Sequence, residues 1–162
     1  MSMEALFLEG GFIDGERTLA TAAADYVAGM AAKITVNGVD VAVTRNTTLG
    51  LFKNDKGVDG STKSGEQVGD APVAGTKKAS ILQGSILVKM TRGTLLAGTT
   101  STPWKLTPSG GGGNWTVGDD LFVAADGRWD NAPQATELPL GSVVEAPTAG
   151  DDKTTMVAKF RL

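Results

Sequence analysis

Cysteine and histidine are both absent from the 162 residues of this sequence. Without cysteine, the chain has no disulfide, no thiol nucleophile and no zinc–thiolate centre. Without histidine, it lacks the commonest general base and the commonest transition-metal ligand, and a Ser-His-Asp triad is excluded. We therefore expect a protein that is not an enzyme, with no catalytic residue, no cofactor and no metal site.

Basic residues and long apolar runs are also scarce. The 15 Lys and Arg residues are outnumbered by 18 Asp and Glu residues, which gives a net charge of −3. Nucleic-acid binding normally needs a basic face, so we expect no nucleic-acid partner. No stretch reaches the ~20 apolar residues of a membrane span. The start, MSMEALFLEGG, has no basic region and no long apolar run, so we expect no secretory signal and assembly in a cytoplasm.

Glycine, by contrast, is abundant, with 22 residues. So many turn-forming residues are typical of short strands joined by tight turns. The length suits one domain over residues 1–162. We predict an all-β fold: a small barrel or sandwich-like domain of short antiparallel strands, with long mobile loops.

Two segments repeat one pattern and predict related β-hairpins within residues 26–60 and 115–152. They are VAGMAAKITVNGVDV, from Val27, and VGDDLFVAADGRWDN, from Val117. Each has two glycines nine residues apart, and each is followed by a Leu-Gly pair. The glycines are Gly29 and Gly38 in the first and Gly118 and Gly127 in the second; the pairs are Leu49-Gly50 and Leu140-Gly141. We expect each hairpin to be followed by a strand that begins at its Leu-Gly.

Asparagine-glycine between alternating apolar residues is a strong signal for a two-residue hairpin turn. A turn at Asn37-Gly38 would pair three sets of residues on one buried face: Val36 with Val39, Ile34 with Val41, and Ala32 with Val43. A turn at Asp126-Gly127 would pair Val123 with Asp130. That register places Phe122 and Trp129 together on the opposite face.

The remaining segments give less uniform signals. Residues 1–25 read as an amino-terminal arm or edge segment. Residues 17–31 have helical spacing and several alanines, but Gly29 interrupts them; a loop entering a strand is favoured, and a short helix over 17–25 stays open. Residues 53–78 are polar and glycine-rich and predict a long flexible loop. Residues 85–91 and 156–162 alternate and predict strands.

Two loop motifs could suggest ligands. NDKGVDG, from Asn54, lacks the spacing of a calcium loop and the glutamate that closes one, so a solvated turn is favoured. The glycine run at 110–113 is not followed by Gly-Lys-Ser/Thr and indicates a linker, not a phosphate loop.

Apolar and aromatic residues supply the candidate contacts. Tryptophan suits core packing, a protein interface or a carbohydrate platform, and all three roles stay open for Trp104, Trp115 and Trp129. Four apolar residues near the start form either a strand added to the fold or an arm ordered by a partner: Leu6, Phe7, Leu8 and Phe12. We predict that these seven residues contribute to a capsid or subunit interface.

The two glycine-marked segments resemble the capsid cement (head decoration) proteins of tailed bacteriophages. The likeness rests mainly on VGDDLFVAADGRWDNAPQATELPLGSVVEAPTAGDDKTTMVAKFRL and less on AGMAAKITVNGVDVAVTRNTTLGLFKND. It implies a virion structural protein that binds the outer surface of an icosahedral capsid. The implied partners are the major capsid protein and further copies of this chain, as a dimer or trimer.

Two other functions remain open on the sequence. One is a carbohydrate-binding β module of a phage tail or adsorption apparatus, which would expose the tryptophans on one surface. The other is a hydrolase with a carboxylate pair. The adjacent Asp119 and Asp120 would point to opposite faces of a strand, which disfavours the hydrolase.

Overall fold

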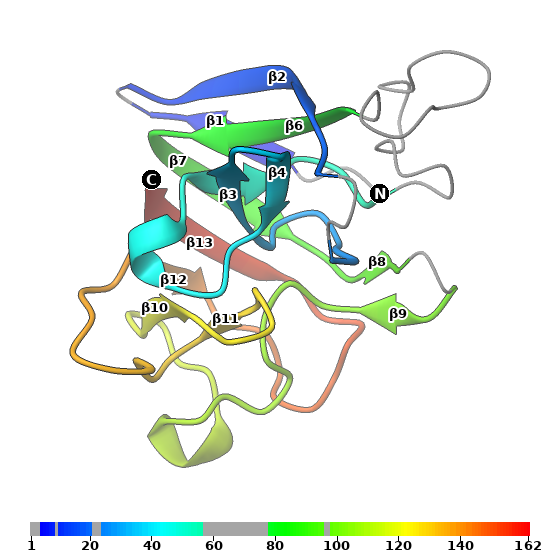
Figure 1. Ribbon diagram of the computed structural model, residues 1–162. Helices are drawn as coiled ribbons and strands as arrows, with labels where there is room; N and C mark the ends of the chain where they lie inside the picture. The colour runs from blue at the N-terminus through cyan, green and yellow to red at the C-terminus, as the bar shows by residue number, and fades with distance from the viewer. Residues whose placement is uncertain (1–3, 9, 21–23, 57–77, 96–97) are drawn as a thin grey trace.

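The computed structural model describes residues 4–8, 10–20, 24–56, 78–95 and 98–162. These residues form thirteen β-strands and two short 3-10 helices, η1 (Arg45–Thr47) and η2 (Gly111–Gly113), with no α-helix among them. The all-β prediction is confirmed (Figure 1).

Two antiparallel sheets and a small hairpin make up the fold. The first sheet has the order β2-β6-β5-β3-β4. Its strands are β2 (Phe12–Thr18), β3 (Ala31–Thr35), β4 (Gly38–Val41), β5 (Gly50–Phe52) and β6 (Lys78–Gln83). The second has the order β1-β7-β13-β12-β10-β11. Its strands are β1 (Glu4–Phe7), β7 (Ser85–Met90), β10 (Asp120–Val123), β11 (Trp129–Asp130), β12 (Gly141–Glu145) and β13 (Met156–Arg161). The hairpin joins β8 (Gly93–Thr94) to β9 (Thr100–Ser101).

The five strands of the first sheet correspond one to one with five strands of the second. The order β2-β6-β5-β3-β4 matches β7-β13-β12-β10-β11, and β1 is an extra strand on the edge of β7. The registers also agree, because Ala32 pairs with Gly50 where Leu121 pairs with Gly141. We call residues 12–83 the first unit and residues 85–161 the second unit. As predicted, β5 and β12 begin at the glycine of Leu-Gly.

The turns that lead into β3 and β10, the equivalent strands of the two units, are equivalent as well. Met30 donates a backbone hydrogen bond to Val27 at 3.2 Å, and Asp119 donates the matching bond to Thr116 at 3.2 Å. The third residue of each turn is glycine with positive φ, 93° at Gly29 and 91° at Gly118. A type II turn requires this conformation at that position, which explains why both segments carry a glycine there.

Each unit closes on itself through one parallel contact. Leu19, just after β2, bridges Val39 of β4, and Trp104 bridges Trp129 of β11. The next residue donates a backbone hydrogen bond of 2.8 Å in both units, from Ala20 in the first and from Lys105 in the second. The chain after the first strand therefore returns to the last strand of its own sheet, and each sheet curls into a small barrel.

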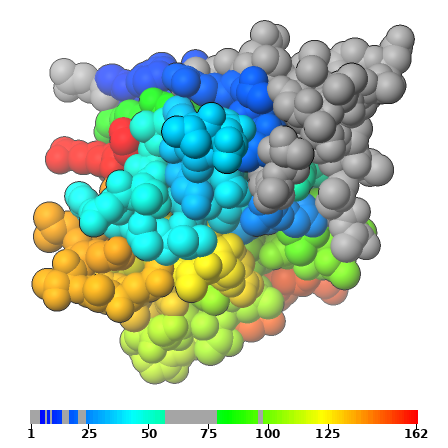
Figure 2. Space-filling model, in the orientation of Figure 1, coloured from blue at the N-terminus to red at the C-terminus, as the bar shows by residue number. Residues whose placement is uncertain are grey.

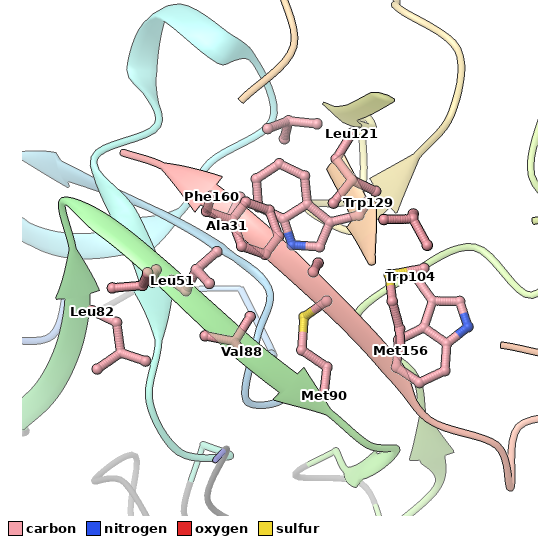
Figure 3. Close-up of a cluster of buried hydrophobic side chains, with 14 of the residues drawn as sticks. Ala31, Leu51, Leu82, Val88, Met90, Trp104, Leu121, Trp129, Met156 and Phe160 are labelled. Atoms are coloured by element: carbon pink, nitrogen blue, oxygen red, sulfur yellow. The ribbon is translucent and has the colours of Figure 1, made fainter. Parts of the chain in front are cut away.

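The core consists of two buried clusters, and the two units share the larger one. One buried cluster lies inside the first unit and includes Tyr26 stacked on Phe52, with ring centroids 3.6 Å apart. The larger cluster fills the second unit and also contains Ala31, Leu51 and Leu82 of the first unit (Figure 3). The first unit therefore buries one face of its own sheet against the second unit.

The first hairpin has the predicted faces but not the predicted register. Ile34 pairs with Val39 and Ala32 with Val41, so the turn lies at Val36 and Asn37. The shift is two residues, which keeps the same side chains on each face. Gly38 is needed for a close approach, since a Cβ there would lie 2.5 Å from the carbonyl oxygen of Thr18. Of the six side chains predicted on one buried face, Ala32, Val39 and Val41 are buried, whereas Ile34, Val43 and Val36, at the tip, are exposed.

The second hairpin is shifted by one residue, and its predicted register is wrong. Val123 pairs with Trp129, and Ala124 accepts a backbone hydrogen bond from Gly127 across a three-residue loop. Gly127 has a φ of 79°, as expected for the left-handed residue that ends such loops. A one-residue slip moves every side chain to the other face. Trp129 therefore packs in the core on Phe160, and does not contact Phe122 across the opposite face.

Two further predictions can be compared with the described residues. In the 17–31 segment, Thr18 ends β2, Leu19 is a bridge residue and Met30 closes a turn, so the described part contains no helix; residues 21–23 lie outside it. The expected solvated turn at Asn54 is wrong at its start, because Asn54 and Asp55 are buried. Most of the predicted 53–78 loop, residues 57–77, lies outside the described residues.

Candidate interaction surface

The equivalence of the units reveals a sheet face that is buried in one unit and open in the other. In the first unit a row of register partners crosses four strands: Ile13, Leu82, Leu51 and Ala31. The last three are at most 1% exposed, because they pack against the second unit. In the first unit this face is therefore already occupied.

The corresponding row of the second unit is open and amphipathic. It runs from β1 to β10 through register partners Leu6, Leu87, Lys159, Ser142 and Asp120. Leu6 is 60% exposed, and Lys159 and Asp120 are also exposed. Partners opposite each other in a sheet share one face. We call this row and the strand positions around it the outer face of the second unit.

The amino-terminal segment supplies one border of the outer face. β1 pairs with β7, from Glu4 opposite Lys89 to Phe7 opposite Ile86. Within the described residues, no strand pairs with the other edge of β1. A shallow hollow of about 270 Å³ lies beside it, lined by Ala5, Leu6, Leu87, Val88, Lys89 and Val157. An unpaired apolar edge beside a hollow is a template for an extended segment of another chain.

A second hollow lies on the same sheet, toward β12. Its volume is about 300 Å³, and its lining includes Asp120, Ser142, Lys159 and Arg161. The outer face thus has apolar side chains and Lys89 near β1, and charged side chains near β10 and β13.

A hydrogen-bonded loop holds the far side of the second unit. Asp130 accepts hydrogen bonds from Ser109 N–H at 2.7 Å and from its hydroxyl at 2.6 Å, and Asn131 accepts one from Gly110 at 2.7 Å. Burial raises the pKa of Asp119, but hydrogen bonds from Thr116 and Asn131 outweigh burial, and the pKa is lowered. The glycine run at 110–113, predicted to be a linker, is therefore fixed on the unit by side-chain contacts.

The predicted contact residues separate into two groups. Trp104, Trp115 and Trp129 are at most 5% exposed and belong to the core. A side chain buried by the fold cannot meet a partner directly, so the burial favours the core-packing role for these tryptophans. The four amino-terminal residues divide between the two sheets: Leu6 and Phe7 in β1, Leu8 just after it, and Phe12 at the start of β2. Phe12 is 50% exposed.

Sequence reasoning missed the rest of the outer face. Alternation predicted the strands that carry Leu87 and Lys159, but nothing near these residues in the sequence indicates that β1 and β10 complete the row. Only the comparison of the two units singles them out. Leu82 and Lys159 are equivalent through the strand registers of the two units, which the sequence alone does not give.

Other kinds of site find little support. No group of three or more His, Cys, Asp or Glu residues in the described part of the chain could hold a metal ion. The same residues contain no helix with the length and apolar character needed to cross a membrane.

The comparisons with known proteins add no relatives. Neither the models of protein families nor the curated proteins include a match to this sequence. The resemblance to capsid cement proteins therefore depends on the residues quoted above.

Proposed function

We propose that this chain is a virion structural protein that binds the outer surface of an icosahedral phage capsid and stabilises it. The outer face of the second unit is the observation that carries the proposal. It offers an exposed apolar edge strand and an adjoining charged patch, on a unit whose equivalent in the same chain is already covered. The implied partner is the major capsid protein.

The geometry suits a contact made many times on a lattice. An extended segment of the capsid could add to the free edge of β1 through backbone hydrogen bonds and place an apolar side chain beside Leu6 and Leu87. Each such contact is short and therefore weak. Linked contacts on a repeating shell raise the effective affinity when the geometry allows them together.

A carbohydrate-binding module receives no comparable support. That function would use tryptophans on a shared surface, and all three are buried. The adjacent Asp119 and Asp120 do not favour a hydrolase either, since Asp119 is engaged by Thr116 and Asn131.

Co-sedimentation with undecorated shells of the cognate phage tests the proposal. We expect the full chain to bind, deletion of residues 1–12 to abolish binding, and Leu6→Asp to weaken it at least about tenfold. Val36→Asp is the matched control, because Val36 is also an exposed apolar residue but lies on the first unit. It should bind like the unchanged chain.

Two results would overturn the proposal. One is failure of the full chain to bind the shell. The other is equal binding by the unchanged chain and by Leu6→Asp. Binding of a soluble glycan by the full chain would favour the carbohydrate module instead.

A further inference from the structure

The second unit carries a polar version of the surface that packs the first unit onto it. Ala31 pairs with Leu51 where Asp120 pairs with Ser142, and Leu51 pairs with Leu82 where Ser142 pairs with Lys159. Three buried apolar side chains thus correspond to an aspartate, a serine and a lysine. The two rows have the same strand register, but the row of the first unit is apolar and that of the second unit is polar.

The end of the neighbouring edge strand, β4 in the first unit and β11 in the second, is covered in both units, but by different elements. In the first unit the turn at Gly127 contacts Val41, and Ala31 donates a backbone hydrogen bond of 3.0 Å to the Gly127 carbonyl. The position equivalent to Val41 is Asn131, which is held by Gly110 of the glycine-rich loop. The second unit therefore covers this place with its own residues 108–114.

The second unit contributes a surface against which the first unit packs, and the first unit has equivalent residues of its own. In the second unit, Val123 is buried in the cluster that also contains Ala31, Leu51 and Leu82 of the first unit. Its equivalent in the first unit is Ile34, which is 42% exposed, next to Val36 at the turn. A hollow of about 430 Å³ lies there, lined by Arg17, Thr18, Ile34, Thr35, Val36, Asn37, Gly38 and Val39. Each chain thus has a polar face on its second unit and a partly apolar hollow on its first unit.

Contact between this face and this hollow would join different surfaces of successive copies. Such a head-to-tail contact can repeat without limit unless its geometry closes a ring. An unpaired lysine or aspartate that must lose water against Ile34 and Val36 makes the contact costly. Stacked repeat proteins similarly need a polar outer face on their terminal repeat.

We propose that the outer face of the second unit is a latent self-association surface. Its partner is the Ile34–Val36 hollow of a second copy of this chain, and Ser142 and Lys159 keep the two apart. The inference does not rest on the proposed function, because no capsid takes part in the contact. It leaves the outer face free for a different partner.

The variant Ser142→Leu/Lys159→Leu restores the pattern of Leu51 and Leu82 and tests the inference. Sedimentation velocity over a concentration series should show association at least about a hundredfold tighter than for the unchanged chain. The matched control is Thr136→Leu/Lys153→Leu, which adds two leucines and removes one lysine at exposed positions elsewhere. The control should associate no more than the unchanged chain.

Adding Val36→Asp to the Ser142→Leu/Lys159→Leu variant identifies the receiving surface. Val36 is exposed, so this change leaves the fold intact, which near-ultraviolet circular dichroism of the buried tryptophans can verify. We expect the added aspartate to abolish the gained association. The proposal is overturned if the leucine variant does not associate, if the control associates equally, or if Val36→Asp has no effect.

Discussion

The indole Nε1 of Trp129, in the second unit, donates a buried hydrogen bond of 2.7 Å to the carbonyl oxygen of Gly29, in the first. The two residues are 100 positions apart in the sequence. Gly29 is also the left-handed residue of the turn that leads into β3. This contact therefore holds the turn before β3, in the first unit, against the core of the second unit.

Replacing Trp129 with phenylalanine should remove this hydrogen bond and leave the Gly29 carbonyl buried without its donor. Trp104→Phe is the control, because Trp104 is equally buried but its Nε1 has no hydrogen-bond partner. We expect the free energy of unfolding to fall by about 1–3 kcal/mol more for Trp129→Phe than for Trp104→Phe. Urea unfolding followed by circular dichroism measures both; equal losses would mean that the hydrogen bond contributes nothing.

The turn at Gly127 should be more sensitive to a methyl group than the turn at Gly118. Both glycines have positive φ, 79° and 91°, so alanine costs about 1–2 kcal/mol of backbone strain at either position. A Cβ at Gly127 would also collide with Val41 of the first unit, whereas one at Gly118 meets nothing within 4 Å. We expect Gly127→Ala to lower the free energy of unfolding by about 1–3 kcal/mol more than Gly118→Ala. A smaller loss at Gly127 would argue against close packing of the units.

Asp126 should make stability depend on pH on the acid side. Burial raises the pKa of Asp126, but Arg128 and Lys105 outweigh burial, and the pKa lies below its ordinary value of 3.8. Lys105 Nζ lies 2.9 Å and Arg128 NH2 2.7 Å from the same carboxylate oxygen. The stabilisation is therefore fully present above the unfolded pKa and is lost as the pH falls through the folded one.

Thermal unfolding of the Asp126→Asn variant between neutral pH and about pH 2 tests this sign. At neutral pH we expect a loss of about 0.5–1 kcal/mol, the range of a partly exposed ion pair. The difference from the unchanged chain should shrink as Asp126 becomes protonated. A difference that grows on acidification would contradict the assigned pKa direction.

Local patterns in the sequence predicted the strands well and their registers poorly. Alternation predicted strands at residues 85–91 and 156–162, and the structure pairs them: Ile86, Val88 and Met90 lie opposite Phe160, Ala158 and Met156 on one buried face. The registers of the hairpins depend on loop length, and glycine alone does not set that length. Gly38 serves a close approach to Thr18, while Gly127 is the third residue of its loop.

The outer face could not be predicted from local patterns because its members come from distant strands. Leu6 and Leu87 are paired by β1 crossing to the second unit, and Lys159 joins them from near the other end of the chain. Trp129 likewise has a partner far away in the sequence, because its indole donates to the Gly29 carbonyl of the first unit. Glycine spacing indicated that residues 29–50 and 118–141 are related. The structure extends this relation to five strands in each unit.

The orientation of the chain on a decorated shell would show whether the outer face of the second unit binds the capsid. Cryo-electron microscopy of undecorated cognate shells mixed with the full chain would give that orientation. We expect bound density in which β1, Leu87 and Lys159 face the capsid. Shells that remain bare, or a bound chain whose outer face points to solvent, would contradict it.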